Sequence, residues 1–249
     1  MDYLLEDSLD LGNTNIVYQA LRYSLKHKDR ESCGIFVLEQ DGYTVNFIPL
    51  INEDIYDINH FISNDKRFYE YYINKNILAL YHSHIDYNSD PSELDINISE
   101  SLSIPSFIFS LKDKSQYLYY PNSYKPKPLE GRIFIPYFQD CISFVKDFFH
   151  LELNIKFTDS IKNWARQGKE SNEFLVNSMK CNFVNVDFSQ LNSYNIIVFK
   201  PNLDRTFHLG VYLGDNIIYH HPIYGYPKKE LFLPEHFNKV YKVYRYKDL

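Results

Sequence analysis

Hydrophobic residues in the first half of the chain recur at helical spacing in some segments and at strand spacing in others. Helical spacing from Asn13 to about Lys26, and again over 64–74 and 92–102, predicts three helices. The apolar runs CGIFVLEQ and YTVNFIPLI flank Asp41-Gly42, which predicts a hairpin because Asp-Gly supplies the positive φ angles of a tight turn. The runs ILALYHSH, SFIFSL and QYLYY predict further strands. Residues 1–120 are therefore expected to form one α/β domain.

A proline-rich segment, 121–131, separates this pattern from a different one. It holds three prolines and one glycine without an apolar period, which is typical of a semi-rigid linker. Beyond it, the spacing predicts an apolar helix over Asp140–Leu151 and a second helix over Ser160–Met179 with a break at Gly168. The runs NIIVFK, TFHLGVYL, NIIYHHPI and KVYKVYRY predict strands, and Gly214-Asp215 is expected to turn the middle pair. Helices followed by strands predict an α+β domain over 132–249.

Composition and charge narrow the class of protein. A hydrophobic fraction of 45% and an aromatic fraction of 17% indicate a folded chain. The formal net charge of -6 and the absence of a Lys/Arg block argue against a nucleic-acid partner. An acidic N-terminal segment and the lack of a long apolar run predict no signal peptide, no membrane insertion and folding in a cytoplasm. The three cysteines have no CxxC spacing, so neither a disulfide framework nor a thiolate zinc site is expected.

The segment YHSHIDYNSDPSELD, 81–95, holds the first candidate site. On a strand, His82 and His84 project from the same face and can both present ring nitrogens to one ion. Asp95 can supply a third ligand and water the fourth, which is the arrangement of a catalytic zinc. Ser92-x-x-Asp95 also fits a helix N-cap followed by an acid in the first turn. The two interpretations are compatible with each other.

This segment, together with Glu31 upstream, resembles the JAMM motif of MPN-domain (JAB1/Mov34-type) metallopeptidases. That motif is an upstream glutamate, His-x-His, seven residues, Ser, two residues and Asp, and every position is present here. The resemblance implies a mixed sheet flanked by helices, with Zn²⁺ bound by His82, His84 and Asp95. It also implies that Glu31 is the general base, that Ser92 stabilises the oxyanion, and that an amide or isopeptide bond is cleaved.

The second candidate site combines a cysteine with histidines. Cys141 lies at the predicted start of a helix behind Asp140, where the helix dipole is expected to lower the pKa of a thiol. His208 and His220 lie on the two arms of a predicted hairpin, nearly opposite each other within one or two residues of register. A thiol peptidase needs at least a cysteine nucleophile and a histidine base that a further polar group orients. The alternative is that Cys141 is a buried helix residue with no catalytic role.

These residues resemble the NlpC/P60 family of papain-like cysteine peptidases. Its Asp-Cys helix start matches Asp140-Cys141, and its His-x-Gly-x-Tyr-x-Gly strand matches 208–214. The resemblance implies Cys141 as the nucleophile, His208 as general base and acid, and His220 as the residue that orients His208. Many members follow the cysteine with Ser-Gly where this chain has Ile-Ser, and His221 competes with His220 for the orienting role.

The order of the two domains resembles the tail-tip assembly proteins of long-tailed bacteriophages. That resemblance implies cleavage of peptidoglycan stem peptides by the second domain and a zinc (iso)peptidase-like first domain. It further implies location at the virion tail tip, after synthesis in the host cytoplasm, with other tail-tip proteins as partners. Two alternatives remain open: a structural tail-tip subunit with vestigial or gated sites, and a cellular isopeptidase acting on ubiquitin-like tags.

Overall fold

The computed structural model divides the chain into two compact units. It describes residues 16–54, 56–59, 61, 63–135, 138–156, 182–200, 208–223 and 225–249, together with the backbone of 161–162. The first unit comprises Met1–Lys125 and Thr158–Ala165, and the second comprises Pro126–Phe157 and Arg166–Leu249. The boundary at Lys125 and Pro126 falls inside the segment 121–131. No helix in the described ranges has the length and apolar character needed to span a bilayer.

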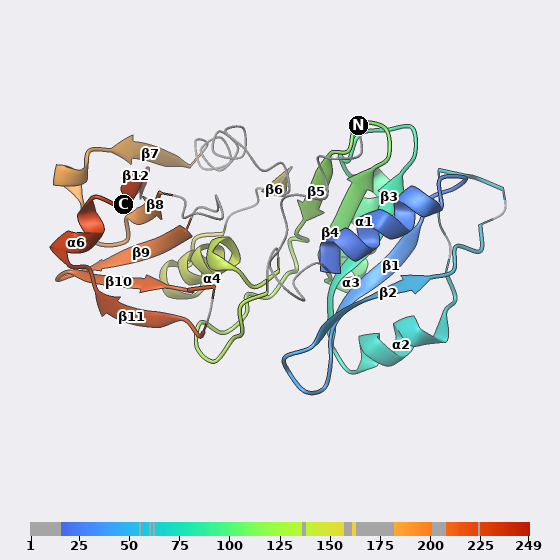
Figure 1. Cartoon of the computed structure of the whole chain (residues 1–249), viewed down its shortest axis with the longest axis horizontal. Coiled ribbons are helices and arrows are strands. Elements are labelled where there is room, and N and C mark those ends of the chain that lie inside the picture. Colours follow the sequence, from blue (N-terminus) through green and yellow to red (C-terminus); the bar gives the residue numbers. More distant parts are fainter. Residues whose placement is uncertain are drawn as a thin grey trace. The chain divides into compact units, whose positions relative to one another are not determined.

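The first unit is built on a mixed β-sheet with the strand order β2-β1-β3-β4-β5, extended at its β5 edge by the short β6 (Figure 1). The central strand β3 pairs antiparallel with β1 and parallel with β4. The predicted hairpin is confirmed as β1 and β2. The strands are β1 (Cys33–Leu38), β2 (Val45–Leu50), β3 (Ile77–His84), β4 (Ser106–Ser110), β5 (Gln116–Tyr119) and β6 (Ile161–Lys162).

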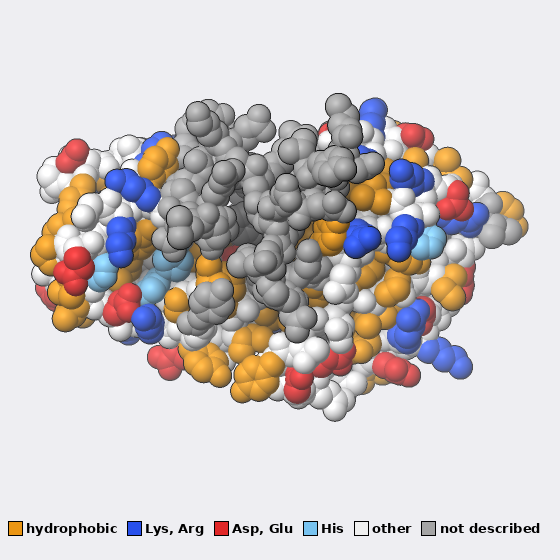
Figure 2. Space-filling model, in the orientation of Figure 1, with side chains coloured by type: hydrophobic (Ala, Val, Ile, Leu, Met, Phe, Trp, Pro, Cys, Tyr) orange, Lys and Arg blue, Asp and Glu red, His pale blue; other side chains and the backbone are white. Residues whose placement is uncertain are grey.

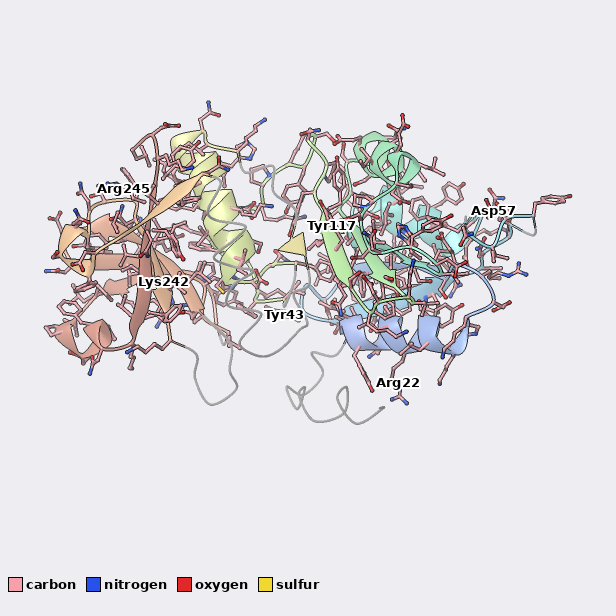
Figure 3. All side chains as sticks on the ribbon, turned by 90° about the horizontal axis from the view of Figure 1, so that it is seen from above. Arg22, Tyr43, Asp57, Tyr117, Lys242 and Arg245 are labelled. Carbon is pink, nitrogen blue, oxygen red and sulfur yellow. The ribbon has the colours of Figure 1, made fainter. Side chains whose placement is uncertain are left out.

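Helices cover both faces of this sheet, as predicted. The helices are α1 (Ile16–Lys26), α2 (Lys66–Ile73) and α3 (Glu93–Leu102). On one face, the Tyr81 hydroxyl of β3 lies 2.7 Å from Ser24 Oγ of α1, and the opposite side of α1, with the exposed Arg22, points away from the sheet (Figure 3). On the other face, Cys33 and Ile35 pack in one cluster with partly buried residues of α2 and α3. The candidate histidines lie on the α3 face, because His82 is the register partner of Cys33.

The second unit is an antiparallel sheet with the strand order β11-β10-β9-β8-β12-β7. Its elements are α4 (Cys141–Leu153), β7 (Phe183–Val186), a 3₁₀ turn (Phe188–Gln190), β8 (Ile196–Phe199), β9 (His208–Gly214), β10 (Ile217–His220), β11 (Lys228–Leu231), α6 (Pro234–Phe237) and β12 (Val240–Tyr246). Helix α4 packs on one face, where Phe144 lies in a cluster with Leu209 and Tyr219. Ile197, Ile218 and Phe232 form a smaller cluster on the opposite face.

The structure corrects three expectations in this half of the chain. The helix expected over Ser160–Met179 is wrong at its start, because Ile161 and Lys162 form β6 on the free edge of β5. The rest of that segment, with Gly168, lies outside the described residues. The β9–β10 turn is formed by Asp215 and Asn216, which both have positive φ, and is one residue later than predicted. Strands β7 and β11 were not predicted, because their sequences FVNV and KKEL lack a long apolar run.

Candidate metal and thiol sites

Local structure brings the two histidines of the first unit to one face of β3. His82 and His84 are two residues apart on a fully buried strand, while Ser83 points to the other face. There the Ser83 hydroxyl accepts a hydrogen bond from the Ser32 backbone N–H, and the Ser83 N–H donates to the Ser32 carbonyl. These bonds fix β3 against the residues that precede β1, so the direction of both imidazole rings is set by backbone pairing.

The first turn of α3 brings a carboxylate to the same place. Asp95 Oδ1 lies 3.1 Å from His82 Nε2, and Asp95 Oδ2 lies 3.4 Å from His84 Nε2. The two Nε2 atoms are 3.2 Å apart, and one ligand atom from each residue lies within 4.8 Å of the others. Two imidazole nitrogens and a carboxylate oxygen, all buried, form a donor set that suits Zn²⁺ with a fourth position for water. His82, His84 and Asp95 therefore could hold a metal ion.

Further hydrogen bonds orient the three groups. The Asn88 carbonyl lies 2.7 Å from His84 Nδ1, so a proton on Nδ1 is held there and Nε2 is left with its lone pair. The Ser92 N–H and hydroxyl both donate to Asp95 Oδ2 at 2.7 Å, and the Asp95 N–H donates to Ser92 Oγ at 3.2 Å. This is a full capping box. The predicted helix cap and the cluster of donor atoms thus occur together.

Electrostatics favour the ionised carboxylate. Burial would raise the pKa of Asp95, but the neighbouring His82 and the hydrogen bonds from His82, His84 and Ser92 outweigh burial and hold that pKa well below its usual range. Burial would likewise lower the pKa of His84, yet contacts with Asp95 and Asn88 and the charge of Glu31 raise it. An anionic Asp95 between two imidazoles is the charge state in which it can bind a cation.

Glu31 lies just before β1 and is buried. Its N–H donates to the Ile58 carbonyl, and its carbonyl accepts from Asn52 Nδ2. The pairing of Cys33 with His82, continued by the bonds between Ser32 and Ser83, places Glu31 across from His84 on the same face of the sheet. The charge of Glu31 acts on the pKa of His84, which fits this position.

Cys141 of the second unit begins α4, as predicted, and its helix is capped by Asp140. Asp140 Oδ1 accepts hydrogen bonds from the N–H groups of Ile142 and Ser143. The expected fall in the pKa of the thiol is wrong, because burial and the charge of Asp140 raise the pKa of Cys141 above its ordinary value. Only 4% of the residue is exposed. The helix N-terminus is present, but burial outweighs it, and the thiol is held protonated.

The two histidines of the β9–β10 hairpin do come together. His208 Nε2 lies 2.6 Å from His220 Nδ1. The residues are diagonal neighbours, because His220 pairs with Gly210 and the register shifts near the turn. A side chain at position 210 would not fit, since an added Cβ would lie 2.6 Å from Ile218 Cδ1 and 3.0 Å from His220 Cβ. Gly210 therefore makes room for the histidine pair.

The Cys141 thiol lies against β9, where it accepts a hydrogen bond from the backbone N–H of Leu209, the residue after His208. Leu209, which follows His208, packs in one cluster with Cys141, whereas the His208 ring stacks on Phe199 of the opposite cluster. Within the described residues, no hydrogen bond joins Cys141 Sγ to a histidine ring. His221 is fully buried on the α4 side, with its ring centroid 6.2 Å from that of Phe144, and among the described residues it forms no hydrogen bond with His208. Cys181 lies outside the described residues.

One charged partner of the histidines was not predicted from the sequence. Glu230 Oε1 of β11 lies 2.9 Å from His220 Nε2. The strand KKEL gives no apolar alternation, and only the pairing of β11 with β10 shows that Glu230 and His220 are neighbours. Figure 2 shows histidine side chains at the surface over β9 and β10, with acidic and basic side chains beside them.

Comparisons with known proteins find a distant relative among phage proteins. No family profile matches it. The chain is 24% identical over 223 residues to the tail tip assembly protein K of Escherichia phage N15, which covers 88% of this chain and 89% of the phage protein. It is thus a distant homologue of that tail tip assembly protein. Among solved structures, protein DSY2949 from Desulfitobacterium hafniense is 22% identical over 40% of this chain and 80% of its own, with a TM-score of 0.29, which is too low to support an argument.

Proposed function

We propose that the chain is a two-domain tail-tip hydrolase that cleaves peptidoglycan stem peptides with the cysteine and histidines of its second unit. The first unit would be a zinc (iso)peptidase of JAMM type, and other tail proteins would be its partners in the virion. The observation that carries this proposal is the homology to a tail tip assembly protein over 88% of the chain. The buried cluster of His82, His84 and Asp95 and the pairing of His208 with His220 support it.

In the first unit, the residues would act on a bound metal and its water. Bound Zn²⁺ would supply Lewis-acid chemistry and lower the pKa of water. His82, His84 and Asp95 would hold the ion, and Glu31, beside His84 on the same face, would accept a proton and deliver it to the leaving amine. Ser92 would keep Asp95 in place through its backbone N–H, and its hydroxyl would turn from Asp95 Oδ2 to donate to the oxyanion.

In the second unit, His208 would take the proton of the Cys141 thiol, and Cys141 Sγ would attack the peptide carbonyl. His220 would orient His208 through the 2.6 Å contact between their rings. Because Asp140 holds the N–H groups of Ile142 and Ser143, the Cys141 N–H would be the backbone donor to the oxyanion at the start of α4. The Cys141 thiol is buried beside the Leu209 backbone, next to His208 in the chain, so a substrate would need access to this buried thiol.

The same burial favours a second candidate function. A thiol that is buried and protonated fits a structural tail-tip subunit with a gated or vestigial site. This alternative shares the homology to a tail tip assembly protein and differs only in turnover.

The test is the digestion of diaminopimelate-type muropeptides, with products resolved by mass spectrometry. The parent is compared with Cys141→Ala and with His82→Ala, both checked for folding. We expect cleavage by the parent and by His82→Ala, and a loss of at least about 10³-fold in Cys141→Ala, because the nucleophile is removed. A folded, zinc-loaded parent that cleaves nothing supports the structural subunit instead.

A further inference from the structure

A line of polar contacts runs from His208 to the edge strand of the second unit. His208 Nε2 contacts His220 Nδ1 at 2.6 Å, and His220 Nε2 contacts Glu230 Oε1 at 2.9 Å. The second carboxylate oxygen, Oε2, lies 2.6 Å from Lys228 Nζ. Because Ile218 pairs with Glu230 and His220 pairs with Lys228, all three side chains project from the same face of β10 and β11. Glu230 is thus held between a cation and an imidazole.

The carboxylate decides where the protons of both rings lie. An ionised carboxylate can only accept a hydrogen bond, so the 2.9 Å contact favours the neutral His220 tautomer that carries its proton on Nε2. His220 Nδ1 is then a lone pair, and it accepts from an Nε2–H of His208. The remaining ring nitrogen of His208, Nδ1, is left as the free base. A hydrogen-bond donor in place of Glu230 would reverse both tautomers. His220 and His208 would then each carry the proton on Nδ1.

We propose that Glu230 is a positioning residue of the thiol site, which fixes the tautomer of His220 and so leaves His208 Nδ1 as the nitrogen that accepts the Cys141 proton. This inference rests on the proposed thiol chemistry of the second unit. Glu230 touches neither thiol nor substrate, and its effect passes through His220. On proton transfer, the S–H bond of Cys141 breaks and an N–H bond forms at His208 Nδ1. His208 Nε2–H and His220 Nε2–H stay in place.

The surrounding charges are consistent with an ionised Glu230. Burial would raise the pKa of Glu230, but the hydrogen bond with Lys228 and the neighbouring His220 lower it below its ordinary value. Burial, Lys228 and His236 together outweigh Glu230 and lower the pKa of His220. For His208, burial and the neighbouring His220 and His221 lower the pKa to about 3, against the opposing charge of Glu230. Both rings are therefore neutral near pH 7, which is the state in which tautomers matter.

The tautomers can be measured directly by ¹⁵N NMR of the ring nitrogens in the full-length chain. We expect the parent to carry the His220 proton on Nε2 and the His208 proton on Nε2. In Glu230→Ala, the His220 ring should populate the Nδ1–H form, and His208 should follow. Glu230→Gln should largely keep the parent tautomers, because its amide oxygen can still accept. A parent with the His220 proton on Nδ1, or a Glu230→Ala variant with unchanged tautomers, would overturn the proposal.

Kinetics on muropeptides give the second readout. Glu230→Ala should lower kcat at least about tenfold with little change in KM, since orientation of a catalytic imidazole is lost and binding is not. Glu235→Ala is the matched control, because it removes the same charge from an exposed carboxylate of the second unit outside the site, and its kcat should stay near that of the parent. An equal loss in both variants would reduce the effect of Glu230 to net charge and overturn the proposal. A parent that cleaves nothing while its tautomers follow Glu230 would reject the proposed function and not the geometry.

Discussion

The two candidate sites differ in how far their groups are assembled. In the first unit, the ring nitrogens of His82 and His84 and the carboxylate of Asp95 already lie within 4.8 Å of one another. In the second unit, the histidines are paired at 2.6 Å, but the buried Cys141 thiol bonds to the Leu209 backbone and forms no hydrogen bond with a histidine ring among the described residues. The donor atoms of the first cluster can thus meet at one cation, whereas the thiol and base of the second are not joined.

The difference follows from the length of chain that each site spans. The metal-type cluster comes from one strand, the next helix and the residues before β1, and a capping box and backbone pairing hold it. The thiol-type cluster takes one residue from a helix and others from three strands of a sheet. Desolvation raises the pKa of both acids, but hydrogen bonds and His82 outweigh it at Asp95, which stays ionised, whereas Cys141 stays protonated. Local motifs bring the side chains of a site together, and the balance between burial and hydrogen bonding sets whether its acidic groups are ionised.

The largest expected effect concerns the reactivity of the thiol. Only the thiolate is nucleophilic, and burial raises the pKa of the comparison residue Cys33 to about 12, which lowers its thiolate fraction at pH 7 by roughly 10³-fold relative to a free thiol. We expect Cys141 in the folded chain to react with iodoacetamide at least about 10³-fold more slowly than in urea. The rates are measured by mass spectrometry of labelled peptides.

Cys33 is the internal control for this experiment, since it is buried in the other unit and belongs to no proposed thiol site. Similar slow rates at Cys33 and Cys141 would sharpen the contrast between the two sites. A Cys141 that reacts much faster than Cys33 at pH 6 would contradict this contrast, because the thiol would then be activated in the folded chain.

The next effect tests the cluster of the first unit. Asp95→Asn keeps the size of the side chain but removes the charge between His82 and His84. We expect zinc affinity to fall more than about 100-fold, since even partners that only orient metal ligands are worth about 10- to 100-fold. Affinity is measured by competition with a chromophoric chelator.

Asp90→Asn is the matched control, because it removes the same charge from an exposed carboxylate in the loop before α3. Its zinc affinity should stay close to that of the parent. Equal zinc binding by Asp95→Asn and the parent would reduce the cluster to a capped helix with two nearby histidines.

The sequence predicted the cluster of the first unit better than that of the second for physical reasons. Strand alternation places His82 and His84 on one face, and the spacing of Ser92 and Asp95 is the signature of a capping box, so both are local. The contact between His208 and His220 could be predicted from the hairpin alone. The turn at Asp215 and Asn216, one residue later than predicted, makes them diagonal neighbours.

Other features depend on contacts between distant segments, which no local pattern contains. The burial of Cys141 follows from the packing of α4 on β9 and β10, and its raised pKa could not be read from its helix position. Glu230 meets His220 only because a strand without an apolar pattern joins the sheet. The same holds for β7 and β6, which add to sheet edges through backbone pairing.

A smaller effect separates the two units by their response to acid. Burial and Arg132 lower the pKa of His221 to about 4, below its ordinary value. The unfolded chain therefore binds a proton at this residue as pH falls below about 6.5, while the folded chain does not until about 4, so stability is present above 6.5 and is lost between these values. The slope is at most about 1.4 kcal/mol per pH unit for one histidine.

His221→Phe should reduce this acid sensitivity, because the phenyl ring fits between Phe134 and Phe144 and binds no proton. Hydrogen exchange of the β10 amides between pH 7 and pH 5 measures the free energy of opening in the second unit. Identical slopes for the variant and the parent would show that His221 is not the responsible group.

The smallest effect tests whether the capping box holds the metal-type cluster. Ser92→Ala removes the hydroxyl that donates to Asp95 Oδ2 and accepts from the Asp95 N–H. Loss of a serine cap costs about 1 kcal/mol, so exchange of the Asp95 and Ile96 amides should speed up by roughly fivefold. Ser101→Ala, at an exposed position in the last turn of the same helix, is the control and should leave those amides unchanged. If Ser92→Ala exchanges like the parent, Asp95 is held by its histidines and not by the cap. The contrast between a locally assembled site and a dispersed one would then lose its structural basis.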